Sequence, residues 1–381
     1  MVTVMLNGLD RIERGRKTQS PGTQSLFNLD ASLFVALGVL VVWIPWVATT
    51  SQHIGRGHPN MEATWHSILT IRSLMELPLS ETFGLPSVTL PGEANRGVLW
   101  GATVPTSQGV QIYTSFPPLG WLLPSAVFSM LGVDPSEASL FSFNAVLAGL
   151  TSLCLSSTVL RVARVAQTST AFLTALSTTL LYLFSSENLL SHSILYWPHA
   201  LLQLILAGAL LVVARILDGH HGRMEFVLLT ALVILSVYTE WSALLFAIAL
   251  CAFFAIRARI AEHKSRKFLL AALSATAVAL TGLVFHFVLA LGFAHATFAW
   301  RTRFIARSLA GGSGLDQLAA YARGWAMSLG LTAIVILLAF LIFRSASLQA
   351  TTSLSWILVL SISPSLTNFV LLQHATQFSF D

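Results

Sequence analysis

The sequence predicts an all-α polytopic membrane protein with about nine transmembrane helices, a re-entrant segment and amphipathic juxtamembrane helices on its outer face. Hydrophobic residues make up 55% of the 381 residues and charged residues only 10%, against about a quarter in soluble domains. The mean hydropathy is +0.75. Apolar runs extend from residue 31 almost to the C-terminus, so we expect a cytoplasmic basic tail over 1–30 and one membrane domain over 31–381.

The charge distribution argues against a nucleic-acid partner. The chain has a formal net charge of +5, but its basic residues lie in short clusters between apolar runs, where the positive-inside rule places them. The two cysteines, Cys154 and Cys251, both lie inside apolar runs. They offer no metal-binding spacing, and we interpret them as packing residues.

The first apolar run, Leu33 to Val47, is not followed by a small-residue cleavage site. We therefore expect an uncleaved first span with its N-terminus in the cytoplasm. Each later run is long enough, or nearly so, for a hydrocarbon core about 30 Å thick. These later candidate spans are 138–160, 169–185, 198–215, 224–238, 241–256, 268–291, 323–343 and 354–372.

Basic clusters follow alternate runs, and all of them face the cytoplasm if the stretch 117–132 does not cross the membrane. Three prolines interrupt this stretch, which favours a re-entrant segment. The alternative is an ordinary short span, which would put about ten basic residues on the opposite side. The re-entrant topology leaves two long outer loops, 50–116 and 293–322. The clusters are Arg161 with Arg164, Arg215 to Arg223, Arg257 to Lys267, and Arg344.

The first outer loop contains a helical pattern that begins after Asn60, a candidate N-cap. One stripe holds Glu62, His66, Thr70 and Ser73, and the opposite stripe is apolar and includes Trp65. We expect this helix to lie along the membrane surface with Trp65 at the headgroup level and the polar stripe toward water or a cavity. Glu62 is then placed to act as a general base, or is simply a solvated carboxylate at a helix N-terminus.

The chain returns to the membrane through Ile112-Tyr-Thr-Ser-Phe-Pro-Pro-Leu-Gly120. This segment brings the hydroxyl of Tyr113 to the membrane boundary, and Pro117 and Pro118 make the entry rigid. It is either part of a binding site or a stiff turn without chemistry.

Together these features resemble the polytopic GT-C glycosyltransferases, above all the protein O-mannosyltransferases, the lipid A aminoarabinose transferases and uncharacterised bacterial members. The family pattern reads Asp-Glu at the first outer helix and Tyr-x-x-Lys-Pro-Pro-Leu at the return. Glu62 matches the Glu, Tyr113 the Tyr, and Pro117 to Leu119 the Pro-Pro-Leu. Met61 stands at the position of the Asp, which is usually the family's base, and Phe116 at that of the Lys. The resemblance covers roughly the first 165 residues.

The resemblance implies a reaction at the outer, periplasmic face of the bacterial inner membrane. A sugar leaves a polyprenyl-phosphate carrier and joins a lipid, glycan or protein acceptor. Such a site needs a carboxylate to deprotonate the acceptor, cations to hold the leaving phosphate, and an apolar groove among the membrane lipids for the prenyl chain. A divalent cation is compatible with the superfamily, but the sequence offers no ligand set for one.

Candidate cations lie in the second outer loop, in Trp300-Arg-Thr-Arg-Phe-Ile-Ala-Arg307. Arg301, Arg303 and Arg307 occur where outer loops normally carry few arginines. Arg303 and Arg307 share a helical face, and paired guanidinium groups suit phosphate oxygens. The alternatives are contact with anionic lipid headgroups or anchoring at the membrane boundary.

Glu240 is the second candidate carboxylate, because Tyr238-Thr-Glu-Trp241 lies between two apolar runs and carboxylates near a membrane core tend to be functional. The alternative is a solvated residue in a short outer turn. In Ser185 to His199 we expect an aromatic and polar belt that anchors the chain, and His286 is expected to be a packed, hydrogen-bonded side chain. Two other functions stay open: a transporter or flippase of a lipid-linked substrate, and an inactive scaffold of an envelope-assembly complex.

Overall fold

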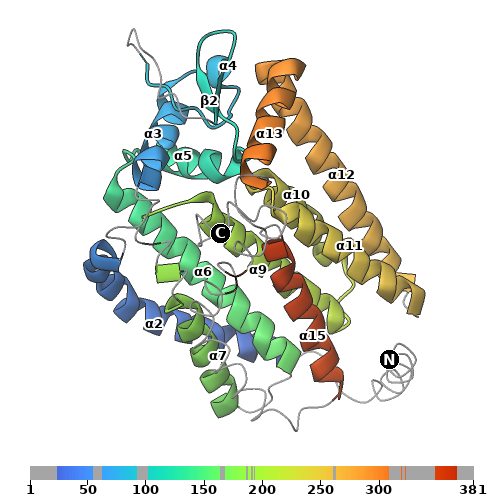
Figure 1. Ribbon diagram of the computed structural model, residues 1–381. Helices are drawn as coiled ribbons and strands as arrows, with labels where there is room; N and C mark the ends of the chain where they lie inside the picture. The colour runs from blue at the N-terminus through green and yellow to red at the C-terminus, as the bar shows by residue number, and fades with distance from the viewer. Residues whose placement is uncertain are drawn as a thin grey trace.

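The computed structural model gives the arrangement of most of the chain (Figure 1). It describes residues 24–54, 62–91, 102–163, 168–185, 188–189, 192, 194–260, 263–308, 319, 322 and 348–366. The long helices of the bundle are α2 (Gln24–Ile54), α6 (Glu137–Ala163), α7 (Thr168–Leu183), α9 (Pro198–Leu217), α10 (Arg223–Thr239), α11 (Ala243–Ile260), α12 (His263–Leu291) and α15 (Leu348–Ile362), which a 3₁₀ turn over Ser363–Leu366 follows.

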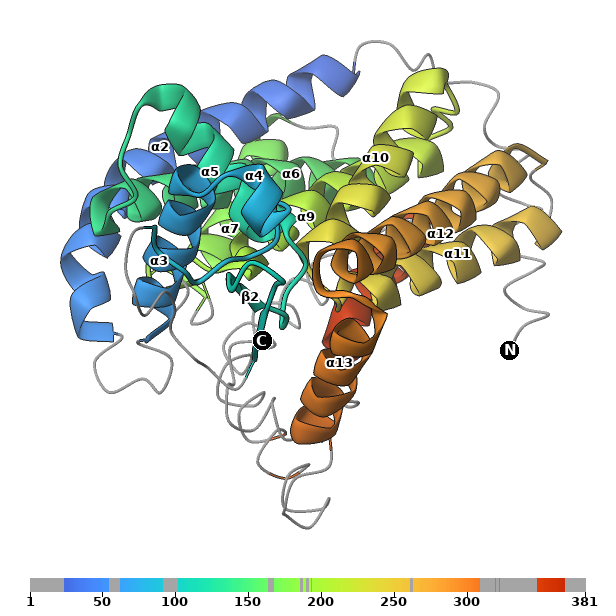
Figure 2. The ribbon, with the colours of Figure 1, turned by 90° about the horizontal axis from the view of Figure 1, so that it is seen from above.

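Shorter elements form a cap at one end of this bundle (Figure 1). The cap consists of α3 (Glu62–Glu76), α4 (Leu79–Thr82), β1 (Thr103–Pro105), β2 (Gln111–Tyr113), α5 (Leu119–Leu131) and α13 (Phe293–Ser308). The two strands pair antiparallel, and the hairpin lies between α3 and α13 (Figure 2).

The helices support an all-α membrane protein. In the described part of the chain, four helices are long and apolar enough to cross a bilayer: Ser32–Thr50, Glu137–Ala163, Pro198–Leu217 and Lys264–Leu291. Helices also occupy the other predicted ranges, but they are shorter, and 323–343 lies outside the described residues. Large apolar side chains such as Val41, 75% exposed, and Leu270, 65% exposed, cover the outer faces of α2 and α12, as lipid contact requires.

The core of the bundle forms around α9, which packs against α6 and α10. Val213 of α9, Val233 of α10 and Phe254 of α11 are fully buried in one apolar cluster with Phe268 of α12. Small residues of α9, such as Ala209, let the helix backbones approach closely. The buried positions thus lie on the helix faces that meet other helices, and the lipid-facing side chains lie on the opposite faces.

The direction of the helices places the basic clusters at one end of the bundle. Arg161, near the end of α6, lies 3.5 Å from Asp218, which follows α9. Lys267, near the start of α12, donates to the carbonyl of His221 in the α9–α10 connection. The clusters after α6, α9 and α11 therefore share the end opposite the cap, in agreement with the predicted alternation; Arg344 lies outside the described residues.

Helix α5 begins and ends at the cap. Gly120, in its first turn, meets Pro198, the first residue of α9. Glu137, a few residues beyond its end, starts α6, and α6 and α9 run in the same direction because their C-terminal ends are joined by Arg161 and Asp218. α5 thus lies across the ends of α6 and α9 rather than between them (Figure 1).

The structure adds detail to three predicted regions. The first helix starts at Gln24, within the predicted 1–30 tail. The first outer loop contains a β-hairpin besides the predicted helix, and the hairpin loop turns at Gly109 with φ +84°. The second, 293–322, begins with a 16-residue helix, α13.

The polar stripe of α3, expected to face water or a cavity, packs against protein. Thr70 and Ser73 are fully buried and His66 is 7% exposed, whereas Trp65 is 68% exposed. Hydrogen bonds compensate part of this burial: Ser73 Oγ donates to Ser87 Oγ at 2.8 Å, and the adjacent Thr64 and Ser67 hydroxyls donate to the carbonyls of Ile194 and Tyr196 at 2.9 and 2.8 Å. The hydroxyl of Thr70 has no hydrogen-bond partner among the described residues. A buried polar group with a partner avoids most of its desolvation cost.

We predict that Gly120→Ala destabilises the protein by about 1–3 kcal/mol, as overpacking does in other tight contacts. A Cβ atom at residue 120 would lie 2.5 Å from the Cβ atom of Pro198. The measurement is the unfolding midpoint of the detergent-solubilised chain. Gly38→Ala is the matched control, because a Cβ atom there meets nothing within 4 Å. Equal stability of the two variants would contradict the predicted contact.

Candidate functional site

A cluster of polar and aromatic side chains lies in the cap, where α3, the segment after β2, the start of α9, the α10–α11 turn and α13 meet. We call it the cap cluster. Its members are His66, Tyr113, Ser115, Phe116, Trp197, His199, Glu240, Trp241 and Arg303.

His66 lies in an aromatic box. Its ring is 4.3 Å from that of Tyr113 and 5.4 Å from that of Trp197, both edge-on, and it stacks on Trp121 at 5.6 Å. Burial lowers the pKa of His66 from 6.5 to about 3, because a charged imidazole would lose its hydration there. His66 is therefore neutral at physiological pH and acts on its neighbours by packing and polarity, not by charge.

Aromatic contacts extend from this box toward a second histidine. Phe116 lies edge-on to Trp197 at 5.4 Å and edge-on to His199 at 5.5 Å. His199 is the second residue of α9, after the N-terminal Pro198, whose fixed φ angle suits the first turn of a helix. Phe116 thus packs the segment after β2 against the start of α9.

Glu240 and His199 form the polar centre of the cluster. Glu240 ends α10 in an extended conformation, which turns its side chain into the cap, and it is only 9% exposed. Its Oε1 lies 3.4 Å from Nε2 of His199. Its Oε2 is buried and has no hydrogen-bond partner within the described residues. A buried carboxylate oxygen in this condition is suited to accept a hydrogen bond from a bound hydroxyl group.

Ser115 links this centre to α13. Its carbonyl accepts a hydrogen bond from Nε1 of Trp241 at 3.1 Å, and its hydroxyl accepts one from Nε of Arg303, also at 3.1 Å. Trp241 directly follows Glu240 in the chain. Ser115 therefore contacts the neighbour of the Glu240 carboxylate on one side and the Arg303 guanidinium of α13 on the other. Trp241 and Trp300 pack with ring centroids 6.1 Å apart and hold α13 in place.

The predicted site residues divide into three groups. His66, Tyr113, Glu240 and Arg303 come together in the cap cluster. Arg301 is exposed, whereas Arg303 is partly buried. For Glu62 and Arg307 only the backbone is described: Glu62 starts α3 one turn before His66, which puts both on one helix face, and Arg307 lies in the last turn of α13.

The sequence did not predict the roles of Ser115 and His199. His199 was expected to anchor the chain, and Ser115 carried no signal except its place beside the return motif. The expectation for His286 is confirmed, because its Nε2 donates to the carbonyl of Phe83 at 2.6 Å. Nothing in the local sequence indicates that Phe116 meets His199, 83 positions later, or that Ser115 meets Arg303, 188 positions later.

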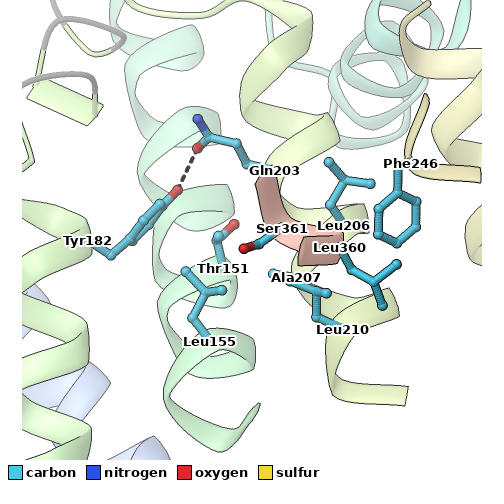
Figure 3. Close-up of a pocket in the computed structure, with 10 residues that line it drawn as sticks. All are labelled: Thr151, Leu155, Tyr182, Gln203, Leu206, Ala207, Leu210, Phe246, Leu360 and Ser361. Carbon is cyan, nitrogen blue, oxygen red and sulfur yellow. Dashed lines mark hydrogen bonds between the residues drawn. The ribbon is translucent and has the colours of Figure 1, made fainter. Parts of the chain in front are cut away.

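A cavity of about 160 Å³ lies inside the bundle and shares no residue with the cap cluster (Figure 3). Its lining is mostly apolar, and Oη of Tyr182 donates to Oε1 of Gln203 at its edge at 2.8 Å. Residues of α6, α7, α9, α11 and α15 surround it: Thr151, Leu155, Tyr182, Gln203, Leu206, Ala207, Leu210, Phe246, Leu360 and Ser361.

No three or more His, Cys, Asp or Glu side chains converge among the described residues as a metal site would require. Comparison with known proteins gives no family: no protein-family model, curated protein or solved structure matches the chain. The function must therefore be inferred from the geometry of the cap cluster.

We predict that acidification destabilises the fold through His66. The pKa of this residue is about 3 in the folded chain and near 6.5 in the unfolded chain, so the unfolded state binds a proton first as the pH falls. The resulting stability is complete above pH 6.5 and is lost toward pH 3, at about 1.4 kcal/mol per pH unit. His66→Phe should flatten the fall of the unfolding midpoint over this range.

Trp121→Phe is the packing control for this measurement, since it changes the same aromatic box without removing a titratable group. It should lower the midpoint at every pH by a similar amount. Burial also lowers the pKa of His192, to about 4. In both variants His192 therefore still makes the unfolding midpoint fall as the pH is lowered. A pH profile of His66→Phe that parallels the wild type would disprove the role of His66.

Proposed function

We propose that the chain is a membrane glycosyltransferase that moves a sugar from a polyprenyl-phosphate carrier to a lipid, glycan or protein acceptor. The proposed reaction takes place in the cap, at the outer face of a bacterial inner membrane. The proposed topology has about nine spans, a cytoplasmic N-terminus and α5 as a re-entrant segment. It is supported by the basic clusters at the end opposite the cap and by α5, whose two ends both lie at the cap.

The observation that carries the proposal is the contact between Arg303 and Ser115. In the resembling family, the aminoarabinose branch has a lysine at the position of Phe116. Arg303 brings a guanidinium to the neighbouring residue from α13, with Nε 3.1 Å from Oγ of Ser115. A cation near the return motif is thus supplied from another part of the chain, and it suits a leaving phosphate.

In the proposed reaction an acceptor hydroxyl or amine attacks the anomeric carbon of the sugar. The bond between that carbon and the phosphate oxygen breaks, and polyprenyl phosphate leaves. Arg303 stabilises the charge that develops on the phosphate. A carboxylate takes the acceptor proton: Glu62 in our assignment, with Glu240 positioning the acceptor through its free Oε2. His199 holds Glu240, and Tyr113 and His66 form a wall of the site.

We predict that Arg303→Ala lowers transfer by about 100-fold or more, as loss of one group that stabilises developing charge does elsewhere. The assay follows radiolabelled sugar from a panel of polyprenyl-phosphate sugars in proteoliposomes. Arg301→Ala is the matched control, since it removes the same charge two residues away from an exposed position. Arg303→Lys should keep part of the activity. Equal loss in Arg301→Ala and Arg303→Ala would contradict a specific phosphate contact.

The two carboxylates give a second prediction. Glu62→Gln should abolish transfer at every pH tested, because a general base contributes about 100-fold to 10,000-fold. Glu240→Gln should mainly raise the KM for the acceptor. Glu76→Gln, near the far end of α3, serves as the control. Transfer that survives Glu62→Gln but not Glu240→Gln would assign the base to Glu240. Movement of a lipid-linked sugar across the bilayer without transfer would favour a flippase.

A further inference from the structure

A strongly basic surface lies at the end of the bundle opposite the cap. It is formed by the start of α10, the end of α11 and the start of α12. We call it the basic collar and define it by Arg223, Arg259, Lys264, Arg266 and Lys267. All of these except Lys267 are exposed. Like charges repel, so such a collar is stable only if an anionic partner or solvent ions compensate it.

The described carboxylates at this end do not compensate the collar. Asp218 lies 3.5 Å from NH1 of Arg161. Glu225 is buried, and its Oε1 accepts from Arg215 at 2.7 Å while its Oε2 accepts from the backbone N–H of Gly222 at 3.0 Å. Both acids therefore bind arginines outside the collar and fix the connection between α9 and α10.

The collar residues are held together by contacts between helices. Lys267 donates to the carbonyl of His221, and the His221 ring packs on that of Phe268 at 5.9 Å. These contacts fix the start of α12 beside the start of α10, and the two helices pack against each other. Arg223 and the pair Lys264 and Arg266 thus project from neighbouring helix ends.

Exposed apolar side chains follow the collar along the same helices. On α10 they include Met224 and Val227, and on α12 Leu270 and Leu273. A surface that is basic at its edge and apolar beyond matches a diacyl lipid with an anionic headgroup. A soluble polyanion would use the charges but leave the apolar faces uncovered.

We infer that the basic collar is a binding site for anionic phospholipids. The headgroup phosphate lies among Arg223, Lys264 and Arg266, and the acyl chains lie along α10 and α12. This inference is independent of glycosyl transfer, because none of these residues belongs to the cap cluster. Zwitterionic phospholipids, whose headgroups carry no net charge, bind this surface more weakly.

The test measures lipid retention by the full chain in mild detergent with native mass spectrometry. Phosphatidylglycerol and cardiolipin are titrated against phosphatidylcholine. Wild type should retain the anionic lipids, and Lys264→Gln with Arg266→Gln should weaken their apparent affinity about 25-fold, since each basic residue near an anionic surface contributes roughly fivefold. Both substitutions are at exposed positions, so the fold should be kept.

The matched control compares single variants: Arg72→Gln removes one exposed positive charge at the cap end, and Lys264→Gln removes one from the collar. Arg72→Gln should retain anionic lipids like the wild type, and Lys264→Gln should bind them about fivefold more weakly. Equal weakening in these two variants, or equal binding of phosphatidylcholine and phosphatidylglycerol, would overturn the site. Soluble glycerol phosphate is tested as a competitor: displacement of the lipid at equal concentration would show that a free anion, and not a phospholipid, occupies the collar.

Discussion

The cap depends on the contact between Glu240 and His199, because it joins the α10–α11 turn to the first turn of α9. A carboxylate so far from water is costly unless a partner faces it. The imidazole of His199 supplies that partner at 3.4 Å. Phe116 packs on the same imidazole, so the segment after β2 is positioned by this pair as well. Removing His199 would leave Glu240 buried without its closest described partner.

Small hydroxyl residues allow the cap to be compact although it is polar. Thr64 and Ser67 of α3 satisfy the carbonyls of Ile194 and Tyr196, two residues in an irregular segment that precedes α9. The carbonyl of Ile194 also accepts from the backbone N–H of Tyr196, so the hydroxyl of Ser67 matters most, at the carbonyl of Tyr196. Buried polar atoms without a hydrogen-bond partner among the described residues occur at several places in the cap: Thr70 Oγ1, Gln111 Oε1, Trp121 Nε1, Trp300 Nε1 and Glu240 Oε2.

The general architecture followed from the sequence, because hydropathy and the spacing of basic residues are local properties of a membrane chain. The helices and the common end of three basic clusters were predicted in this way. The packing of the polar stripe of α3 against protein was not, because a stripe of His, Thr and Ser is equally typical of a face toward water or a cavity. The link of Ser115 to Arg303 joins residues 188 positions apart, and no local pattern reports such a contact.

The contact of α5 with α9 has a consequence for the order of assembly during synthesis. The hydroxyl of Tyr196 donates to the carbonyl of Gly120, 76 residues earlier in the chain, and Pro198 lies against the same glycine. When α5 leaves the ribosome, its partner α3 has been made, and Ser125 of α5 can already meet the carbonyl of Ile71. The part of its packing surface that the start of α9 provides does not yet exist. The cap is thus closed by a late event, after α6 and α7 are already synthesised.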